Sequence, residues 1–169
     1  GDHIALRRLL LEAGADLGIR EYGFNSLLSL RLEKSYGIWS AEFTQGYTPG
    51  MTGMDRWIDW EKSGFIGRDA ALAERDGNGP AQRLVTLDVA ANGADASGYE
   101  PVWSGDRRVG FVTSGGYGHT VGKSLAMALV DSDLAEVGTD LSVHIVGIER
   151  DTNIIAPSPY DPAGAVMRA

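Results

Sequence analysis

The spacing of apolar residues changes from a helical to a strand-like period at Asp76-Gly77-Asn78-Gly79-Pro80. Before this stretch, apolar side chains recur at helical spacing, for example from Ile4 to Ala13. After it, Val85, Leu87 and Val89 alternate with their neighbours, as residues of a strand do. Glycine and proline interrupt helices and strands alike. Residues 76–80 are therefore predicted to link two parts of the chain.

Two helices are predicted near the start of the chain. The first covers about residues 4–13, and Gly14 stands where a left-handed cap belongs. The second has Asn25 as its N-cap, carries the leucines of residues 27–32 and ends by Gly37.

A third helix is predicted from about Arg68 to Arg75. Between the second and third helices, residues 38–60 are irregular and rich in aromatic side chains. The tryptophans are predicted to be core residues rather than platforms for a ligand, and they are Trp39, Trp57, Trp60 and Trp103.

The C-terminal half is predicted to consist of five to six short strands joined by glycine-rich turns. The expected strands cover about residues 84–89, 101–103, 109–113, 124–130, 141–146 and 153–156. Short strands of this kind are typical of a small antiparallel barrel or a jelly-roll-like sheet. The predicted fold class is α+β, with a helical part over residues 1–79 and the barrel over residues 80–169.

The composition excludes several classes of function. The formal net charge of −8 disfavours nucleic acid and anionic membrane surfaces, since both attract basic faces. The chain has no cysteine, which excludes disulfides, thiolate metal sites and cysteine nucleophiles. No apolar run approaches the roughly 20 residues that span a bilayer. The expected location is the cytoplasm.

The glycine-rich run of residues 114–119 and the histidines offer no clear catalytic pattern. The run follows a strand without opening a helix, so a tight strand connection is favoured over a phosphate loop. His3, His119 and His144 are scattered and have no metal-ligand spacing. Each is predicted to be a surface or half-buried side chain.

Arg31 is the most informative charged residue, because it lies on an otherwise leucine-rich helix. Three readings remain open from the residues alone. Arg31 is a solvated helix residue, one half of an ion pair, or a planar donor that holds a buried anion.

Five motifs, in order, resemble the T-protein-like aminomethyltransferases of glycine cleavage. They are Arg31-Leu32-Glu33-Lys34-Ser35-Tyr36-Gly37-Ile38-Trp39, Tyr47-Thr48-Pro49, Lys62-Ser63-Gly64-Phe65-Ile66-Gly67-Arg68-Asp69-Ala70-Ala71-Leu72, Val109-Gly110-Phe111-Val112-Thr113-Ser114-Gly115-Gly116 and Lys123-Ser124-Leu125-Ala126-Met127-Ala128. The resemblance is closest to the C-terminal region of dimethylglycine and sarcosine dehydrogenases, through Tyr99-Glu100-Pro101-Val102-Trp103 and the tail of residues 158–162. An Arg that stand-alone T-proteins often carry near Ser97 is absent.

The resemblance implies a module that binds tetrahydrofolate and accepts a one-carbon unit when a methylated amine is demethylated. In the family, folate lies between three lobes, and residues 1–79 resemble the middle lobe without its N-terminal part. Arg31 and Trp39 are the folate contacts that it implies. Glu33 is a third candidate, which would otherwise pair with Arg68 or Lys34.

The implied partners are the upstream N-terminal lobes, an upstream FAD domain and a small methylated amine. No catalytic residue is expected in this chain, which alone is expected to be inactive. Alternatives are a stand-alone aminomethyltransferase, a related folate-dependent demethylase, a non-enzymatic folate protein of iron–sulfur assembly, and a scaffold that has lost folate.

Overall fold

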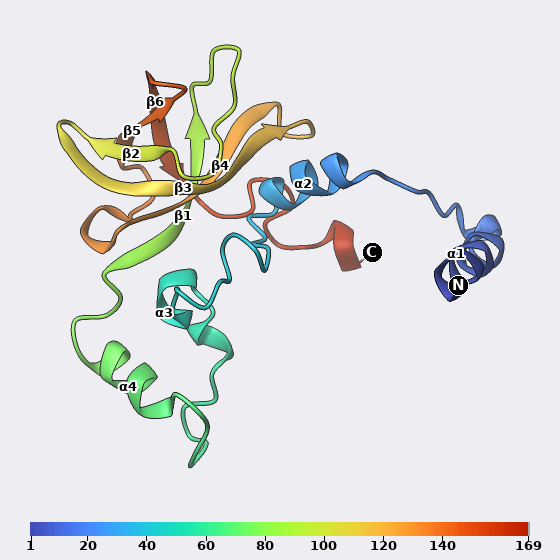
Figure 1. Cartoon of the computed structure of the whole chain (residues 1–169), viewed down its shortest axis with the longest axis horizontal. Helices are drawn as coiled ribbons and strands as arrows, with labels where there is room; N and C mark the ends of the chain where they lie inside the picture. Colours follow the sequence, from blue (N-terminus) through green and yellow to red (C-terminus); the bar gives the residue numbers. More distant parts are fainter. Residues whose placement is uncertain (169) are drawn as a thin grey trace.

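The computed structural model describes residues 1–168 and combines a β-barrel with helices on its outer side (Figure 1). The helices are α1 (Asp2–Ala13), α2 (Phe24–Glu33), α3 (Pro49–Thr52) and α4 (Arg68–Asp76). The strands are β1 (Gln82–Val89), β2 (Pro101–Ser104), β3 (Arg107–Gly118), β4 (Lys123–Asp131), β5 (Asp140–Ile145) and β6 (Ile148–Ile155). The predicted α+β class is confirmed.

The six strands form a closed barrel in the order β1-β4-β3-β2-β5-β6. Every neighbouring pair is antiparallel, and pairing of Thr86–Val89 with Thr152–Ile155 closes the barrel. The predicted antiparallel barrel of about six strands is therefore confirmed. Closure pairs each strand with a neighbour on both sides, which shortens the sheet edge that is left open to another chain.

Strand β4 is buried from Ser124 to Val130 because both of its faces are covered. Ala126, Ala128 and Val130 belong to the barrel interior. Leu125 and Met127 alternate with them and pack against Leu32 of α2 on the outside. Burying a large aliphatic side chain stabilises the fold by about 1.5–3 kcal/mol, so this second cluster fixes α2 against the barrel (Figure 1).

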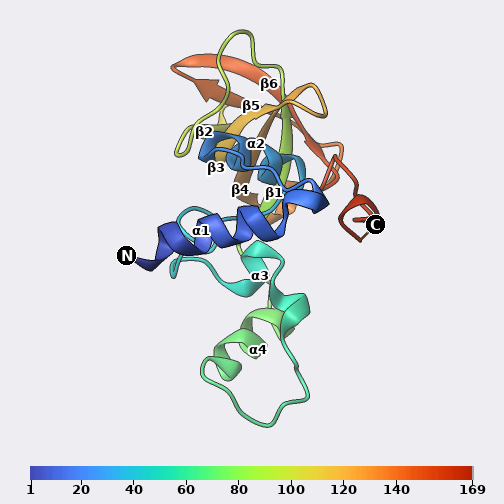
Figure 2. The ribbon, with the colours of Figure 1, turned by 90° about the vertical axis from the view of Figure 1, so that its right-hand side faces the viewer.

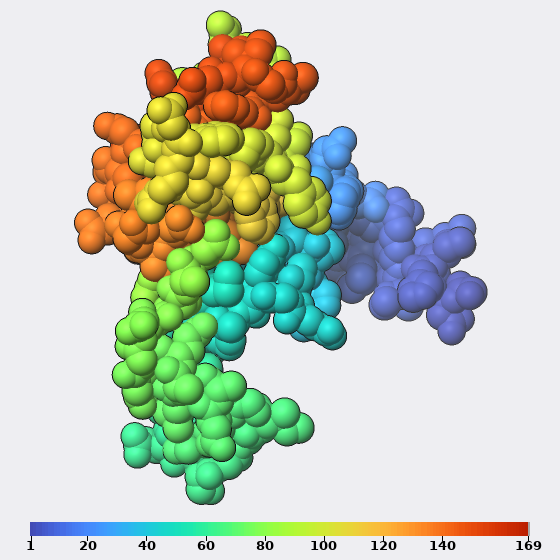
Figure 3. Space-filling view, turned by 60° about the vertical axis from the view of Figure 1, so that its left-hand side comes forward, coloured from blue at the N-terminus to red at the C-terminus, as the bar shows by residue number. Residues whose placement is uncertain are grey.

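Helix α1 stands apart from the barrel and is joined to α2 by an extended segment (Figure 1), and Figure 2 views the molecule from the side of α1. It has no buried residue, and Ile4, Leu6, Leu9 and Leu10 are 53–64% exposed. In the space-filling view, the first residues project beyond the rest of the molecule (Figure 3). Among residues 1–168, no helix has the length and apolarity that crossing a membrane requires.

The helix ends differ from the predicted ones. Helix α2 begins at Phe24 with Gly23 as its N-cap, so the prediction for Asn25 was wrong by two positions. Gly14 has a φ of −94° and is not a left-handed cap. Gly37 lies beyond the end of α2, where a Cβ atom would come within 2.6 Å of the Phe43 ring. Glycine is needed there for close packing rather than for ending the helix.

Strands β3 and β6 depart most from the predicted ranges. Strand β3 runs through Gly118, so residues 114–118 are strand and not a connection. A Cβ atom on Gly115 would lie 2.1 Å from the Ala96 carbonyl oxygen, which explains a glycine within the strand. Strand β6 starts at Ile148, because Val146 and Gly147 form a tight turn with φ values of 50° and 76°.

Candidate functional site

The guanidinium of Arg31 is held inside the protein. Its Nη1 donates to Glu42 Oε2 at 3.3 Å and to the Tyr36 carbonyl at 3.2 Å. Burial lowers the pKa of Arg31, and the charge of Glu42 opposes that effect. The structure shows Arg31 in an ion pair, which is one of the three readings from sequence. The Nε atom of Arg31 has no hydrogen-bond partner among the described residues.

The carboxylate of Glu42 lies at the centre of this buried network and is fully inaccessible to solvent. Besides Arg31, it accepts hydrogen bonds from the Ile38 amide at 2.9 Å, from the Thr113 hydroxyl at 2.7 Å and from the Ser114 hydroxyl. A buried carboxylate is tolerated when a cation and several donors compensate for lost hydration. Sequence reasoning missed Glu42, since it lies in an irregular segment without a periodic pattern.

Glu33 is 1% exposed and supports the turn between β3 and β4. Its Oε1 accepts from the amides of Thr120 at 2.5 Å and Val121 at 3.1 Å. The expected alternative pairing with Arg68 or Lys34 was wrong. Lys34 lies near the Asp161 carboxylate at 3.8 Å, and the guanidinium of Arg68 donates to a backbone carbonyl at 3.0 Å.

Trp39 is 82% exposed on the turn that follows α2. The amides of Ala41, Glu42 and Phe43 all donate to the Ile38 carbonyl, which makes this turn compact. The prediction that the tryptophans are core residues was wrong, because Trp39 and Trp57 are exposed and the other two are only half-buried. The exposed indole of Trp39 is free to stack on a flat ligand.

A cleft of about 850 Å³ lies between the segment after α2, the α3 region and the C-terminal tail. We call it the tail cleft. Its wall includes the cations Lys34, Arg56 and Arg168 and the aromatic rings of Tyr36 and Trp57. The guanidinium of Arg56 lies 5.6 Å from the centre of the Trp57 ring. In a chain of net charge −8, this cleft gathers positive charge beside aromatic surface.

Asp161 anchors the C-terminal tail at the edge of this cleft. Its Oδ1 accepts from the Ala165 amide at 2.7 Å, and its carbonyl accepts from Lys34 at 2.5 Å. Burial raises the pKa of Asp161, but the backbone donors and Lys34 outweigh it, so the pKa lies below its ordinary value of 3.8. The carboxylate therefore stays charged and keeps the tail in place at neutral pH.

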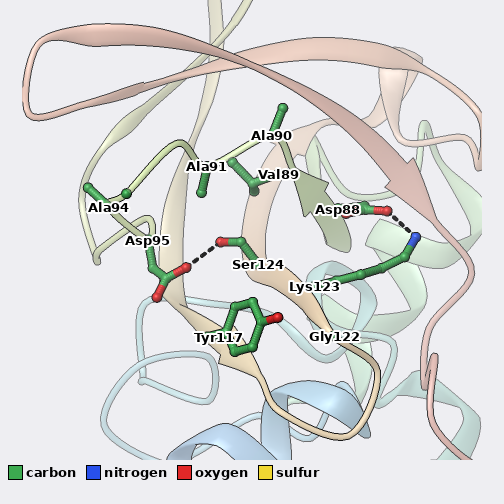
Figure 4. Close-up of a pocket in the computed structure, with 11 residues that line it drawn as sticks. Asp88, Val89, Ala90, Ala91, Ala94, Asp95, Tyr117, Gly122, Lys123 and Ser124 are labelled. Atoms are coloured by element: carbon green, nitrogen blue, oxygen red, sulfur yellow. Dashed lines mark hydrogen bonds and ion pairs between the residues drawn. The ribbon is translucent and has the colours of Figure 1, made fainter.

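A second hollow of about 480 Å³ lies at one end of the barrel (Figure 4). Its charged groups pair with each other or with a neighbour. Lys123 contacts Asp88, and Ser124 donates to Asp95 at 2.6 Å. In the tail cleft, Lys34 is paired with Asp161, but Arg56 and Arg168 have no carboxylate partner among the described residues. The tail cleft is therefore the stronger candidate for binding an anionic ligand.

The barrel and the helical part of the chain each match a known protein domain. Residues 82–161 match the family model described as the glycine cleavage T-protein C-terminal barrel domain. Residues 2–62 match the model of the GCVT N-terminal domain. Between them the two models cover most of the chain and identify it as a T-protein-like module.

Known proteins similar to this chain include two kinds of enzyme. Mitochondrial dimethylglycine dehydrogenase of Rattus norvegicus is 34% identical over 91% of this chain. An aminomethyltransferase of Caldanaerobacter subterraneus subsp. tengcongensis is 32% identical over 84% of it. The chain spans 18% of the length of that dehydrogenase and 37% of that aminomethyltransferase.

The fold also recurs in a solved structure. The crystal structure of glycine cleavage system aminomethyltransferase T from Bartonella henselae gives a TM-score of 0.82. The likeness covers 92% of this chain and 44% of that chain at 23% identity, so it establishes the fold.

Proposed function

We propose that this chain is the C-terminal portion of a tetrahydrofolate-binding module that accepts a one-carbon unit during demethylation of dimethylglycine or sarcosine. The observation that carries the proposal is an exposed Trp39, held on a compact turn, in a chain that also gathers three cations in the tail cleft. The similarity to dimethylglycine dehydrogenase supports the choice of substrate class.

The residues suit the chemistry of a folate. A flat pterin requires an aromatic surface, and Trp39 and Trp57 are both exposed. An anionic glutamyl tail requires cations, which Arg56 and Arg168 supply in the tail cleft. When bound, tetrahydrofolate provides the nitrogen atoms that take up the one-carbon unit.

The three residues singled out by the family resemblance have different proposed roles. Trp39 contacts the folate directly. Arg31 and Glu33 do not line the tail cleft, and their proposed role is to support the folate site from inside the fold, because both are buried and engaged with backbone or carboxylate groups of the same chain. Together these residues orient the folate and exclude water, which keeps a reactive imine or formaldehyde away from the solvent.

The general acid or base and the FAD are proposed to reside upstream, in N-terminal lobes and a flavin domain of a longer parent chain. The apolar stripe of α1 supports this arrangement, since Ile4, Leu9 and Leu10 are more than half exposed and exposed apolar patches of this kind mark interaction sites. This chain alone is then inactive in demethylation.

The test is an assay of the natural protein that contains this chain, with dimethylglycine and sarcosine as substrates. With tetrahydrofolate present, the proposal predicts methylene-tetrahydrofolate as the product. Trp39→Ala is expected to release free formaldehyde instead, while Trp60→Phe, a change at a half-buried tryptophan, keeps transfer intact. Demethylation whose product never depends on tetrahydrofolate rejects the proposal.

A stand-alone aminomethyltransferase is the second candidate, favoured by the 32% identity to the bacterial enzyme. Release of ammonia from an aminomethylated carrier protein, without oxidation of methylated glycines, would select it. A scaffold without folate is the third candidate, since Ser97 stands where stand-alone T-proteins often carry an Arg.

A further inference from the structure

Glu42 joins three separate parts of the chain through one carboxylate. Its Oε2 accepts from Arg31 of α2 at 3.3 Å and from the Ile38 amide at 2.9 Å. Its Oε1 accepts from the hydroxyls of Thr113 and Ser114 on β3. With both oxygens engaged and no surface exposed, Glu42 has no access to a ligand.

A bulge in β3 directs the hydroxyls of Thr113 and Ser114 to Glu42. The pairing of β3 with β4 shifts register between Val112 and Ser114, which leaves Thr113 without an opposite residue. Bulges of this kind turn a side chain away from its regular direction. The Thr113 hydroxyl also lies 3.0 Å from the Met127 carbonyl, but its single hydrogen favours the closer, charged acceptor.

The Glu42 carboxylate also fixes the turn that carries Trp39. The Ile38 amide donates to the carboxylate, and the Ile38 carbonyl accepts from the Glu42 amide at 3.1 Å. A Cβ atom on Gly37 would lie 2.8 Å from the Glu42 Cβ, so the chain is closely packed on both sides of Trp39. Movement of Glu42 would therefore move the Trp39 turn.

We propose that Glu42 is a positioning residue, which sets the orientation of Trp39 toward the folate by tying its turn to the β3 bulge. The folate part of this proposal rests on the proposed function. The positioning part concerns contacts within the chain and can be measured without any ligand.

The first experiment is ¹⁹F NMR of the natural protein that contains this chain, labelled with 5-fluorotryptophan, in which Trp39→Phe and Trp103→Phe assign the two resonances that are compared. Glu42→Gln is expected to shift or broaden the Trp39 resonance while that of Trp103 stays unchanged. The matched control is Glu100→Gln, since both carboxylate oxygens of Glu100 also accept hydrogen bonds, from backbone amides at 2.7 and 3.1 Å, but in loops of the barrel. An unchanged Trp39 resonance in folded Glu42→Gln protein would overturn the proposal.

A second variant keeps the experiment decisive if Glu42→Gln does not fold. Thr113→Val with Ser114→Ala removes the two hydroxyls and keeps the charged pair of Arg31 and Glu42. The same displacement of the Trp39 resonance is expected, because the tie to β3 is lost. A Trp39 resonance that matches the wild type in this double variant overturns the role of the bulge.

Titration of tetrahydrofolate into the natural protein that contains this chain then separates the two proposals. Glu42→Gln is expected to weaken binding by up to about tenfold, as loss of one aromatic contact does, with Glu100→Gln equal to wild type. Equal affinity in wild type and Glu42→Gln overturns the positioning role toward folate. Absence of binding in the wild type rejects the proposed function, whereas the NMR result still decides the positioning.

Discussion

Replacing Arg31 by Met is expected to destabilise the fold by about 3 kcal/mol. The charged groups of Arg31 and Glu42 are 3.3 Å apart and their side chains are 7% and 0% exposed. At an effective dielectric constant of about 20, this distance gives an attraction of about 5 kcal/mol. Desolvation of both groups offsets part of it, and removing one partner of a buried pair costs about 3–5 kcal/mol. Three remaining donors to Glu42 place the expected loss at the lower end.

The assay is urea unfolding of the wild type, of both single variants and of the double variant Arg31→Met with Glu42→Gln. Arg31→Met leaves the Glu42 carboxylate without its cation, and Glu42→Gln removes that carboxylate charge. The double variant is therefore expected to lose about 2 kcal/mol less free energy of unfolding than the sum of the two single losses. The exposed pair of Arg7 and Glu21, at 2.6 Å, is the matched control. Its coupling should be smaller and should fade with salt, since exposed charges are screened.

Two results would refute this reasoning. One is a loss below about 1 kcal/mol for Arg31→Met, which is the range of an exposed pair. The other is strict additivity of the two changes, because it would mean that the guanidinium and the carboxylate do not interact.

The remaining predictions concern packing and pH. Leu32→Ala opens a cavity between α2 and β4 and should lower the free energy of unfolding in urea by about 2–5 kcal/mol. A decrease under about 1 kcal/mol would contradict the packing of α2 through Leu32. Burial raises the pKa of Tyr47 above its ordinary value of 10.0. As the pH rises past that value, the unfolded chain releases this proton before the folded protein does, so the folded state loses stability. Tyr47→Phe should flatten this alkaline slope, and an identical slope would exclude Tyr47. The pKa of Asp161 is lowered in the folded protein. The charged carboxylate therefore stabilises the fold at a pH above its ordinary pKa, and this stabilisation is lost as the pH falls through the folded-state pKa. In the wild type, the rate at which a protease cleaves the tail should rise as the pH falls, and Asp161→Asn should remove this pH dependence. Cleavage rates that are equal in the two proteins at each pH would contradict the prediction.

Much of the fold could be predicted from the residues because apolar side chains recur at different spacings in helices and in strands. The alternation at Val85, Leu87 and Val89 identified β1, and the apolar run in residues 124–130 identified β4. The strand order could not be predicted, since β1 pairs with β4 and β6 through contacts far apart in sequence. The start of β6 was missed because a turn at Val146 lacks the usual asparagine or aspartate.

The candidate site was predictable only in part. The motif singled out Arg31, Glu33 and Trp39, but a motif does not show which way a side chain points. Glu42 lies eleven residues from Arg31 in sequence, in a segment without regular structure. Its hydroxyl partners on β3 depend on a bulge that the alternating pattern does not reveal. Hydrophobicity alone also placed Trp39 in the core, whereas the compact turn holds it in solvent.

Whether the protein binds folate is tested by a calorimetric titration of tetrahydrofolate into the natural protein that contains this chain. We expect saturable binding that Trp39→Ala weakens and Trp60→Phe leaves unchanged. No binding to a protein whose unfolding transition is intact would contradict the account and favour a scaffold that kept the family's fold without its ligand.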